Sequence, residues 1–102
     1  MVKHIVFFRL QEQAEGHSKQ ENAQIIKQGL ESLINKIPYL IKSEVGINIP
    51  NAPKTDFDIC LQCEFDNWSD LNAYAVHPEH LKIVEYIGKV KSARSAVDYE
   101  AK

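Results

Sequence analysis

The chain lacks the sequence features that mark membrane, secreted and nucleic-acid-binding proteins. No apolar run approaches the roughly 20 residues that a transmembrane helix requires. Charges interrupt the apolar N-terminus and no small-residue cleavage site follows it, which argues against a signal peptide. The 12 basic and 14 acidic residues give a formal net charge of −2, whereas a nucleic-acid-binding face would need a basic excess. We therefore expect a soluble cytoplasmic protein with neither membrane nor nucleic acid as a partner.

Only two cysteines are present, Cys60 and Cys63, in the CxxC spacing of redox and metal-binding motifs. They fall in the stretch Phe57–Phe65, where apolar and polar residues alternate as in a half-buried strand. Residues three apart on a strand point to opposite faces, so these sulfurs cannot share a disulfide or a metal ion. We expect two small packing residues, and no other motif predicts a metal or a cofactor.

What is present resembles an average globular domain, with 44% apolar and 25% charged residues. A chain of 102 residues is long enough for one domain with one core. No internal repeat, linker or low-complexity stretch divides it. We expect a single domain over residues 1–102.

Hydrophobic periodicity predicts elements in the order β-α-β-β-α-β. Four strands are expected, at residues 2–10, about 41–49, 57–65 and 95–100. Three helical segments are expected, from a capping box at Ser18 to Pro38, from about 67 to 75, and from Pro78 to Gly88. Residues 11–17 are expected to form a loop, and Trp68 to anchor packing. This order is the ferredoxin-like α+β plan, in which helices cover one face of an antiparallel sheet.

The other face of that sheet would be bare, and it would carry apolar side chains. Ile5 and Phe7 of the first strand point there, and leaving each in water forfeits roughly 1.5–3 kcal/mol relative to burial. A second copy of the sheet is the simplest cover, so we predict a homodimer whose sheets face each other to form a barrel. Polar residues share the same face and must form ion pairs or lie at its rim. They are Lys3, Arg9, Asp58, Gln62 and Glu64.

The stretch Tyr74–His80 contains the densest potential chemistry in the chain. Two of the four histidines, His77 and His80, lie three residues apart around Pro78, with Tyr74 just before them. Histidine titrates near neutral pH, and the tyrosine hydroxyl forms directed hydrogen bonds. His77 is expected to cap the helix that Pro78 opens.

Together with the first and last strands, this stretch resembles the stress-responsive α/β-barrel (Dabb) domain family over essentially the whole chain. The segments that carry the resemblance are Val2–Phe8, Lys36–Pro38, Glu44–Gly46, Tyr74–His80 and Ala96–Tyr99. The resemblance implies a ferredoxin-like monomer paired into a dimeric α+β barrel, most bacterial members of which are uncharacterised stress-associated proteins.

One branch, the plant polyketide cyclases resembling olivetolic acid cyclase, performs a cofactor-free aldol condensation in a pocket between sheet and helices. The resemblance implies that His80 matches the base of that branch, Tyr74 its assisting tyrosine, and His4 a pocket-lining histidine. A further histidine of that branch falls at Ile59 here, which departs from the pattern.

The residue types themselves suit this chemistry. A base beside a ketone needs a pKa near the operating pH, and a tyrosine hydroxyl can bond a developing enolate. We therefore assign His80 as base, Tyr74 as oxygen partner and His4 as orienter. The residues expected to line the mainly apolar pocket are Val6, Phe8, Ile59, Leu61 and Val84.

Structural alternatives stand beside each assignment. In the structural alternative, His80 forms a hydrogen bond with a backbone carbonyl, Tyr74 fills the core, and His4 forms a hydrogen bond across the sheet. At the level of function, the first hypothesis is a Dabb homodimer that binds a small hydrophobic or aromatic molecule. The second is a cofactor-free cyclase, isomerase or aldolase-like enzyme, and the third is an oxygenase or haem-handling protein by analogy of fold.

Overall fold

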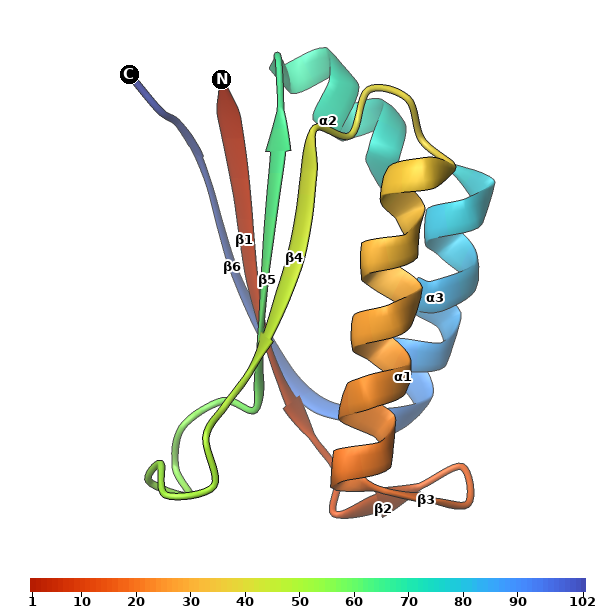
Figure 1. Ribbon diagram of the computed structural model, residues 1–102, viewed down its shortest axis with the longest axis vertical. Helices are drawn as coiled ribbons and strands as arrows, with labels where there is room; N and C mark the ends of the chain where they lie inside the picture. The colour runs from red at the N-terminus through yellow and green to blue at the C-terminus, as the bar shows by residue number, and fades with distance from the viewer.

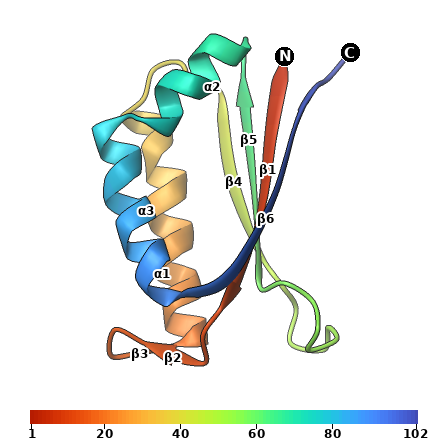
Figure 2. The ribbon, with the colours of Figure 1, turned by 180° about the vertical axis from the view of Figure 1, so that it is seen from behind.

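A four-stranded antiparallel sheet carries all the long helices on one face (Figure 1). The computed structural model describes all residues, 1–102. The central strand β1 (Val2–Leu10) lies between β5 (Ile59–Phe65) and β6 (Lys91–Glu100), and β4 (Lys42–Ile47) forms the edge beyond β5. Seen from behind, both termini lie at the same end of the sheet (Figure 2). This arrangement confirms the ferredoxin-like α+β prediction.

Three helical segments begin at residues whose side chains cap them. Ser18 and Glu21 form the expected capping box of α1 (Lys19–Glu31), each accepting a hydrogen bond from the other's backbone N–H. Asn67 caps α2 (Trp68–Ala75), and His77 caps α3 (Pro78–Val90) by accepting from the Glu79 N–H at 3.1 Å. The expected capping role of His77 is therefore confirmed, and Pro78 occupies the first turn as predicted.

The strand register assigns the side chains to the two faces of the sheet as the alternation of apolar and polar residues predicted. On β1 and β5 the buried residues face the helices, where they join the buried apolar residues of the helices in one core. Cys63 is fully buried in this core while Cys60 points to the opposite face, so the predicted separation of the two thiols is confirmed. Burial raises the pKa of the Cys63 thiol to about 11, as expected of an inert packing residue.

Several boundaries differ from those expected. The predicted loop 11–17 contains a two-stranded hairpin, β2 (Gln13–Ala14) and β3 (His17–Ser18), because Glu15 and Gly16 both adopt positive φ, at 52° and 77°. The first helix ends before Pro38, since α1 passes into a short 3-10 helix, η1 (Ser32–Asn35).

The last two elements are longer than the sequence pattern indicated. Gly88 does not end α3, which continues until the fully buried Val90 and joins β6 with no linker. Strand β6 begins four residues before the predicted Ser95, because it pairs with β1 along the whole of that strand, with an irregularity near Arg9. Trp68 is 55% exposed at the start of α2, so its expected role as a packing anchor was wrong.

The two long helices meet closely. A Cβ added at Gly29 of α1 would lie 2.5 Å from Ile83 Cδ1 of α3, whereas one added at Gly88 would meet nothing within 4 Å. Asn22 of α1, with no exposed surface, accepts from the Tyr86 hydroxyl of α3 at 2.5 Å and donates to the Ala14 carbonyl of the hairpin at 3.1 Å. One buried amide thus joins both helices to the hairpin.

The face of the sheet away from the helices carries the exposed apolar side chains that were expected there. Phe7 is 37% exposed, and Val97 and Tyr99 of β6 are 56% and 47% exposed. At one end Lys3 and Lys42 both lie within 4 Å of Glu64, at 3.8 and 3.9 Å. The charges on this face therefore pair with one another at its rim.

The other two charges predicted for this face, Arg9 and Asp58, also have partners. The Arg9 guanidinium lies 4.5 Å from the centre of the Phe57 ring and donates to the Thr55 carbonyl at 2.6 Å. Asp58 accepts from the Leu10 N–H at 2.8 Å and lies 3.5 Å from Lys19.

An ion pair on α1 covers the outer edge of β4. Glu31 accepts from the Val45 N–H at 2.9 Å, and Lys27 donates to the Val45 carbonyl at 2.7 Å. The two side chains are themselves 2.7 Å apart. Both hydrogen-bonding groups of one edge residue are therefore occupied by the neighbouring helix.

Candidate functional site

A cavity of about 380 Å³ lies between the helix-facing side of the sheet and the long helices. This volume is at the lower end of the range for small-molecule sites. Its lining comes from five elements and is mostly apolar: His4, Val6, Phe8, Leu30, Leu61, His80, Val84, Ile87, Lys91 and Arg94. The structure therefore brings together His4 and His80, and four of the five residues predicted to line the pocket.

His80 lies in the first turn of α3 with its tautomer set by the backbone. Its Nδ1 is 3.3 Å from the Ala75 carbonyl, and because a carbonyl oxygen only accepts, Nδ1 carries the hydrogen. Burial lowers the pKa of His80 below 6.5, and the charges of His4, Arg94 and His77 act in the same direction. At neutral pH the ring is therefore uncharged, with Nε2 free to accept a proton.

His4 is held by a carboxylate on the neighbouring strand. It faces Asp98 directly in the β1–β6 register, and His4 Nδ1 donates to Asp98 Oδ1 at 2.5 Å. The His4 side chain is only 12% exposed and that of Asp98 is 32% exposed. The expected cross-strand bond of His4 and its place at the cavity are thus compatible, because Nδ1 makes the bond and Nε2 is left without a protein partner.

The ring of Tyr74 lies beside both imidazoles, but its hydroxyl lies near the Cys63 sulfur. Its ring centre is 4.1 Å from that of His80 and 6.3 Å from that of His4. The side chain is 1% exposed, does not line the cavity, and carries its hydroxyl 3.8 Å from the Cys63 sulfur. Burial raises the pKa of this phenol far above its ordinary value. The geometry thus gives Tyr74 the role of packing His80, and it does not place the hydroxyl as an oxygen partner for a ligand.

Ile59 is the other predicted site residue that this cavity does not include. It is buried at the far end of β5, paired with Phe8 of β1 and Ile47 of β4, and it lines a different hollow. The position that departs from the plant cyclase pattern therefore lies outside the cavity of this chain.

Sequence reasoning missed the polar residues that β6 contributes. Lys91 and Arg94 line the cavity, and Asp98 holds His4. Strand alternation places Arg94 and Asp98 on one face, but only the β1–β6 register shows that this face points to the helices. Ile87 was detectable, because it follows His80 and Val84 at helical spacing.

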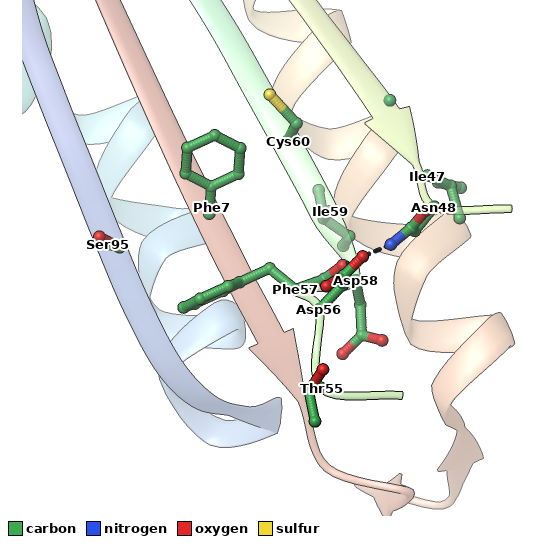
Figure 3. A pocket seen from close by; sticks show the side chains of 11 residues that line it. Phe7, Ile47, Asn48, Thr55, Asp56, Phe57, Asp58, Ile59, Cys60 and Ser95 are labelled. Atoms are coloured by element: carbon green, nitrogen blue, oxygen red, sulfur yellow. Dashed lines mark hydrogen bonds between the residues drawn. The ribbon is translucent and has the colours of Figure 1, made fainter. Parts of the chain in front are cut away.

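A larger hollow, of about 760 Å³, lies on the opposite face of the sheet. Figure 3 shows Phe7, Cys60 and Ser95 projecting into it from three strands, with the segment Thr55–Asp58 at one end and the helices behind the sheet. It contains no histidine, lysine or arginine. This hollow belongs to the bare face with its exposed apolar side chains and brings together none of the predicted catalytic residues.

No helix has both the length and the apolar character needed to cross a membrane. No three residues among the histidines, cysteines and acids are grouped so as to hold a metal ion.

The fold and the cavity define a ferredoxin-like α+β protein with a pocket between its sheet and its helices. The chain belongs to the family described as the stress responsive A/B barrel domain (Dabb), whose family model matches residues 2–101. The family predicted from the sequence is therefore confirmed.

Solved structures and one curated protein are similar to this chain. A dimeric protein of unknown function and ferredoxin-like fold from Bacteroides fragilis NCTC 9343 is 37% identical, with a TM-score of 0.83 over 98% of this chain and 95% of that one. The stress-response A/B barrel domain-containing protein DABB1 of Arabidopsis thaliana is 27% identical over 103 residues, which cover 99% of this chain. The chain spans only about half, 47%, of the length of DABB1.

A hydroxynitrile lyase from Passiflora edulis has the same fold. It is 21% identical, with a TM-score of 0.79 over 96% of this chain and 90% of that one. At this identity the likeness concerns the fold alone.

Proposed function

We propose that this protein binds a small, mainly apolar molecule in the cavity between its sheet and its helices. The observation that carries the proposal is the lining itself, in which apolar side chains from β1, β5, α1 and α3 surround a cavity of about 380 Å³ with His4 and His80 among them. A few polar groups in a mainly apolar cavity are what a small-molecule site requires.

We also propose that two copies of the chain pair through the bare face of the sheet. The relative from Bacteroides fragilis is a dimeric protein of ferredoxin-like fold. In this chain Phe7, Val97 and Tyr99 are exposed on that face, and a partner sheet would remove their apolar surface from water. Such a pairing leaves the cavity on the helix side of each protomer.

Filling the cavity tests the binding proposal. Val84 is 40% exposed and lines the cavity from α3, so Val84→Trp should occupy the space without disturbing the core. A screen of alkyl and aryl compounds by ligand-observed NMR should find binders of the parent protein that Val84→Trp no longer binds. Leu81→Trp, on the exposed side of the same helix, is the matched control. Binders that are unaffected by Val84→Trp would show that the cavity is not their site.

A second candidate is cofactor-free proton transfer, favoured by the state of His80. The Ala75 carbonyl fixes the hydrogen on Nδ1, burial lowers the pKa, and the Tyr74 ring packs against the imidazole at 4.1 Å. These features give a neutral, oriented base at the cavity. A base of this kind could remove a proton beside a carbonyl group of a bound molecule, and His4, held by Asp98, could bond the oxygen.

Hydrogen exchange tests this second function without knowledge of the natural substrate. An aryl methyl ketone in D2O should exchange its methyl hydrogens faster with the protein present, and His80→Gln should abolish the acceleration. His17→Gln, at an exposed position of the hairpin with its side chain 44% exposed, is the control for general histidine catalysis. Acceleration that survives His80→Gln would remove His80 from the role of base.

A further inference from the structure

Every polar side chain that lines the cavity is basic. His4 and His80 lie among the apolar residues, and Lys91 and Arg94 line the cavity from β6, with no aspartate or glutamate in the lining. Asp98, which lies on the same face of β6 as Arg94, is already bonded to His4. The cavity therefore carries positive charge that its own walls do not neutralise.

The two permanently charged residues of the lining, Lys91 and Arg94, are free to bind a ligand. Eleven ion pairs are present in the chain, and neither Lys91 Nζ nor the Arg94 guanidinium takes part in any of them. Neither side chain donates a hydrogen bond to the protein. Arg94 nevertheless lies close enough to His80 for its charge to disfavour protonation of that ring.

A guanidinium has a planar fork of donors that matches the two oxygens of a carboxylate. Arg94 lines the cavity while remaining an exposed residue, so an entering ligand can reach its guanidinium and water partly screens its charge. A neutral ligand can accept hydrogen bonds from these donors but brings no opposite charge, and a cationic ligand would be repelled by them.

We propose that the ligand of this cavity is an amphipathic anion, a molecule with an apolar aliphatic or aromatic body and one carboxylate, whose carboxylate is bound by Arg94 with Lys91 nearby. The body lies against Val6, Phe8 and Leu61. This inference rests on the proposed function, since it names the class of molecule for the same cavity.

Binding of two matched compounds tests the proposal. Calorimetric titration with 4-hexylbenzoate and 4-hexylbenzamide compares the same body with and without the charge. We expect the parent protein to bind the benzoate about tenfold more tightly, the scale of one charge-assisted hydrogen bond. Arg94→Gln should remove this preference, Arg94→Lys should keep part of it, and Lys82→Gln, which changes an exposed lysine of α3 outside the cavity, should leave it unchanged.

The outcomes separate this inference from the function on which it rests. Equal affinity for the two compounds, or an equal loss of both in Arg94→Gln, would overturn the anionic ligand while the apolar cavity stands. If the parent protein binds neither compound, the apolar cavity and the anionic ligand both fall. A preference that shrinks as salt is raised and disappears in Arg94→Gln would support the assignment of Arg94.

Discussion

Removing the hydroxyl of Tyr86 should destabilise the protein although it deletes only one atom. The hydroxyl donates to Asn22 Oδ1 at 2.5 Å, and Asn22 has no exposed surface. In Tyr86→Phe the amide oxygen keeps its buried place and loses its only partner, because no other group in the chain donates to it. A buried acceptor left unpaired costs about 1–3 kcal/mol.

The same reasoning predicts a specific non-additivity. Asn22→Leu removes the acceptor but leaves the Tyr86 hydroxyl and the Ala14 carbonyl without their partner. In the double variant the unpaired hydroxyl is gone as well, so its cost should be smaller than the sum of the two single costs, by about 1–2 kcal/mol.

Urea unfolding at one fixed protomer concentration measures these differences, since pairing of chains would make the midpoint depend on concentration. Tyr39→Phe is the control, because Tyr39 is half-buried against the same core and its hydroxyl has no hydrogen-bond partner in the protein. We expect it to change stability by less than about 0.5 kcal/mol. A loss in Tyr86→Phe no larger than that of Tyr39→Phe, or strict additivity in the double variant, would refute the reasoning.

Three further predictions concern the helices, the sheet face and the cavity. Gly88→Ala should stabilise α3 by about 0.5–1 kcal/mol in chemical unfolding. Gly29→Ala should give no such increase in stability, because its Cβ would lie 2.5 Å from Ile83 Cδ1 of α3. Phe7→Asp should convert a dimer into a monomer in light scattering, and Leu81→Asp on the outer helix face should not; a Phe7→Asp dimer would contradict pairing through the sheet. Burial lowers the pKa of His80 in the folded state, so the unfolded state takes up a proton at this residue first as the pH falls. The free energy of unfolding should therefore decrease below about pH 6.5. In His80→Gln the urea midpoint should decrease less between pH 7.5 and 5.5 than in the parent protein.

The sequence predicted the main elements well because their local signals agree. Alternation in β1 and β5, the capping box at Ser18 and the proline after His77 each match the structure. The hairpin at Glu15 was missed because a turn of two positive φ residues is usually marked by Asn-Gly or Asp-Gly. The end of α3 was misplaced because tertiary burial of Val90 outweighs the weak helix preference of Gly88.

The part of the candidate site that depends on local periodicity could also be predicted from the sequence. His4 and His80 could be placed on the inner face by the periods of their own elements. Pairing between β1 and β6 depends on register, which the sequence of either strand alone does not specify, so Asp98 and Arg94 were not assigned to the site. The direction of the Tyr74 hydroxyl depends on packing among Phe65, Cys63 and His80, and no local pattern predicts it.

The cover that α1 provides over the edge of β4 bears on how these chains avoid aggregation. A foreign strand that added to this edge would have to displace Lys27 and Glu31 from the Val45 backbone and separate their charges. Strand β6, at the opposite edge of the sheet, has no such pair. Cross-β growth of a partly unfolded chain should therefore begin at β6, and protective charges or a proline would be most effective on that strand.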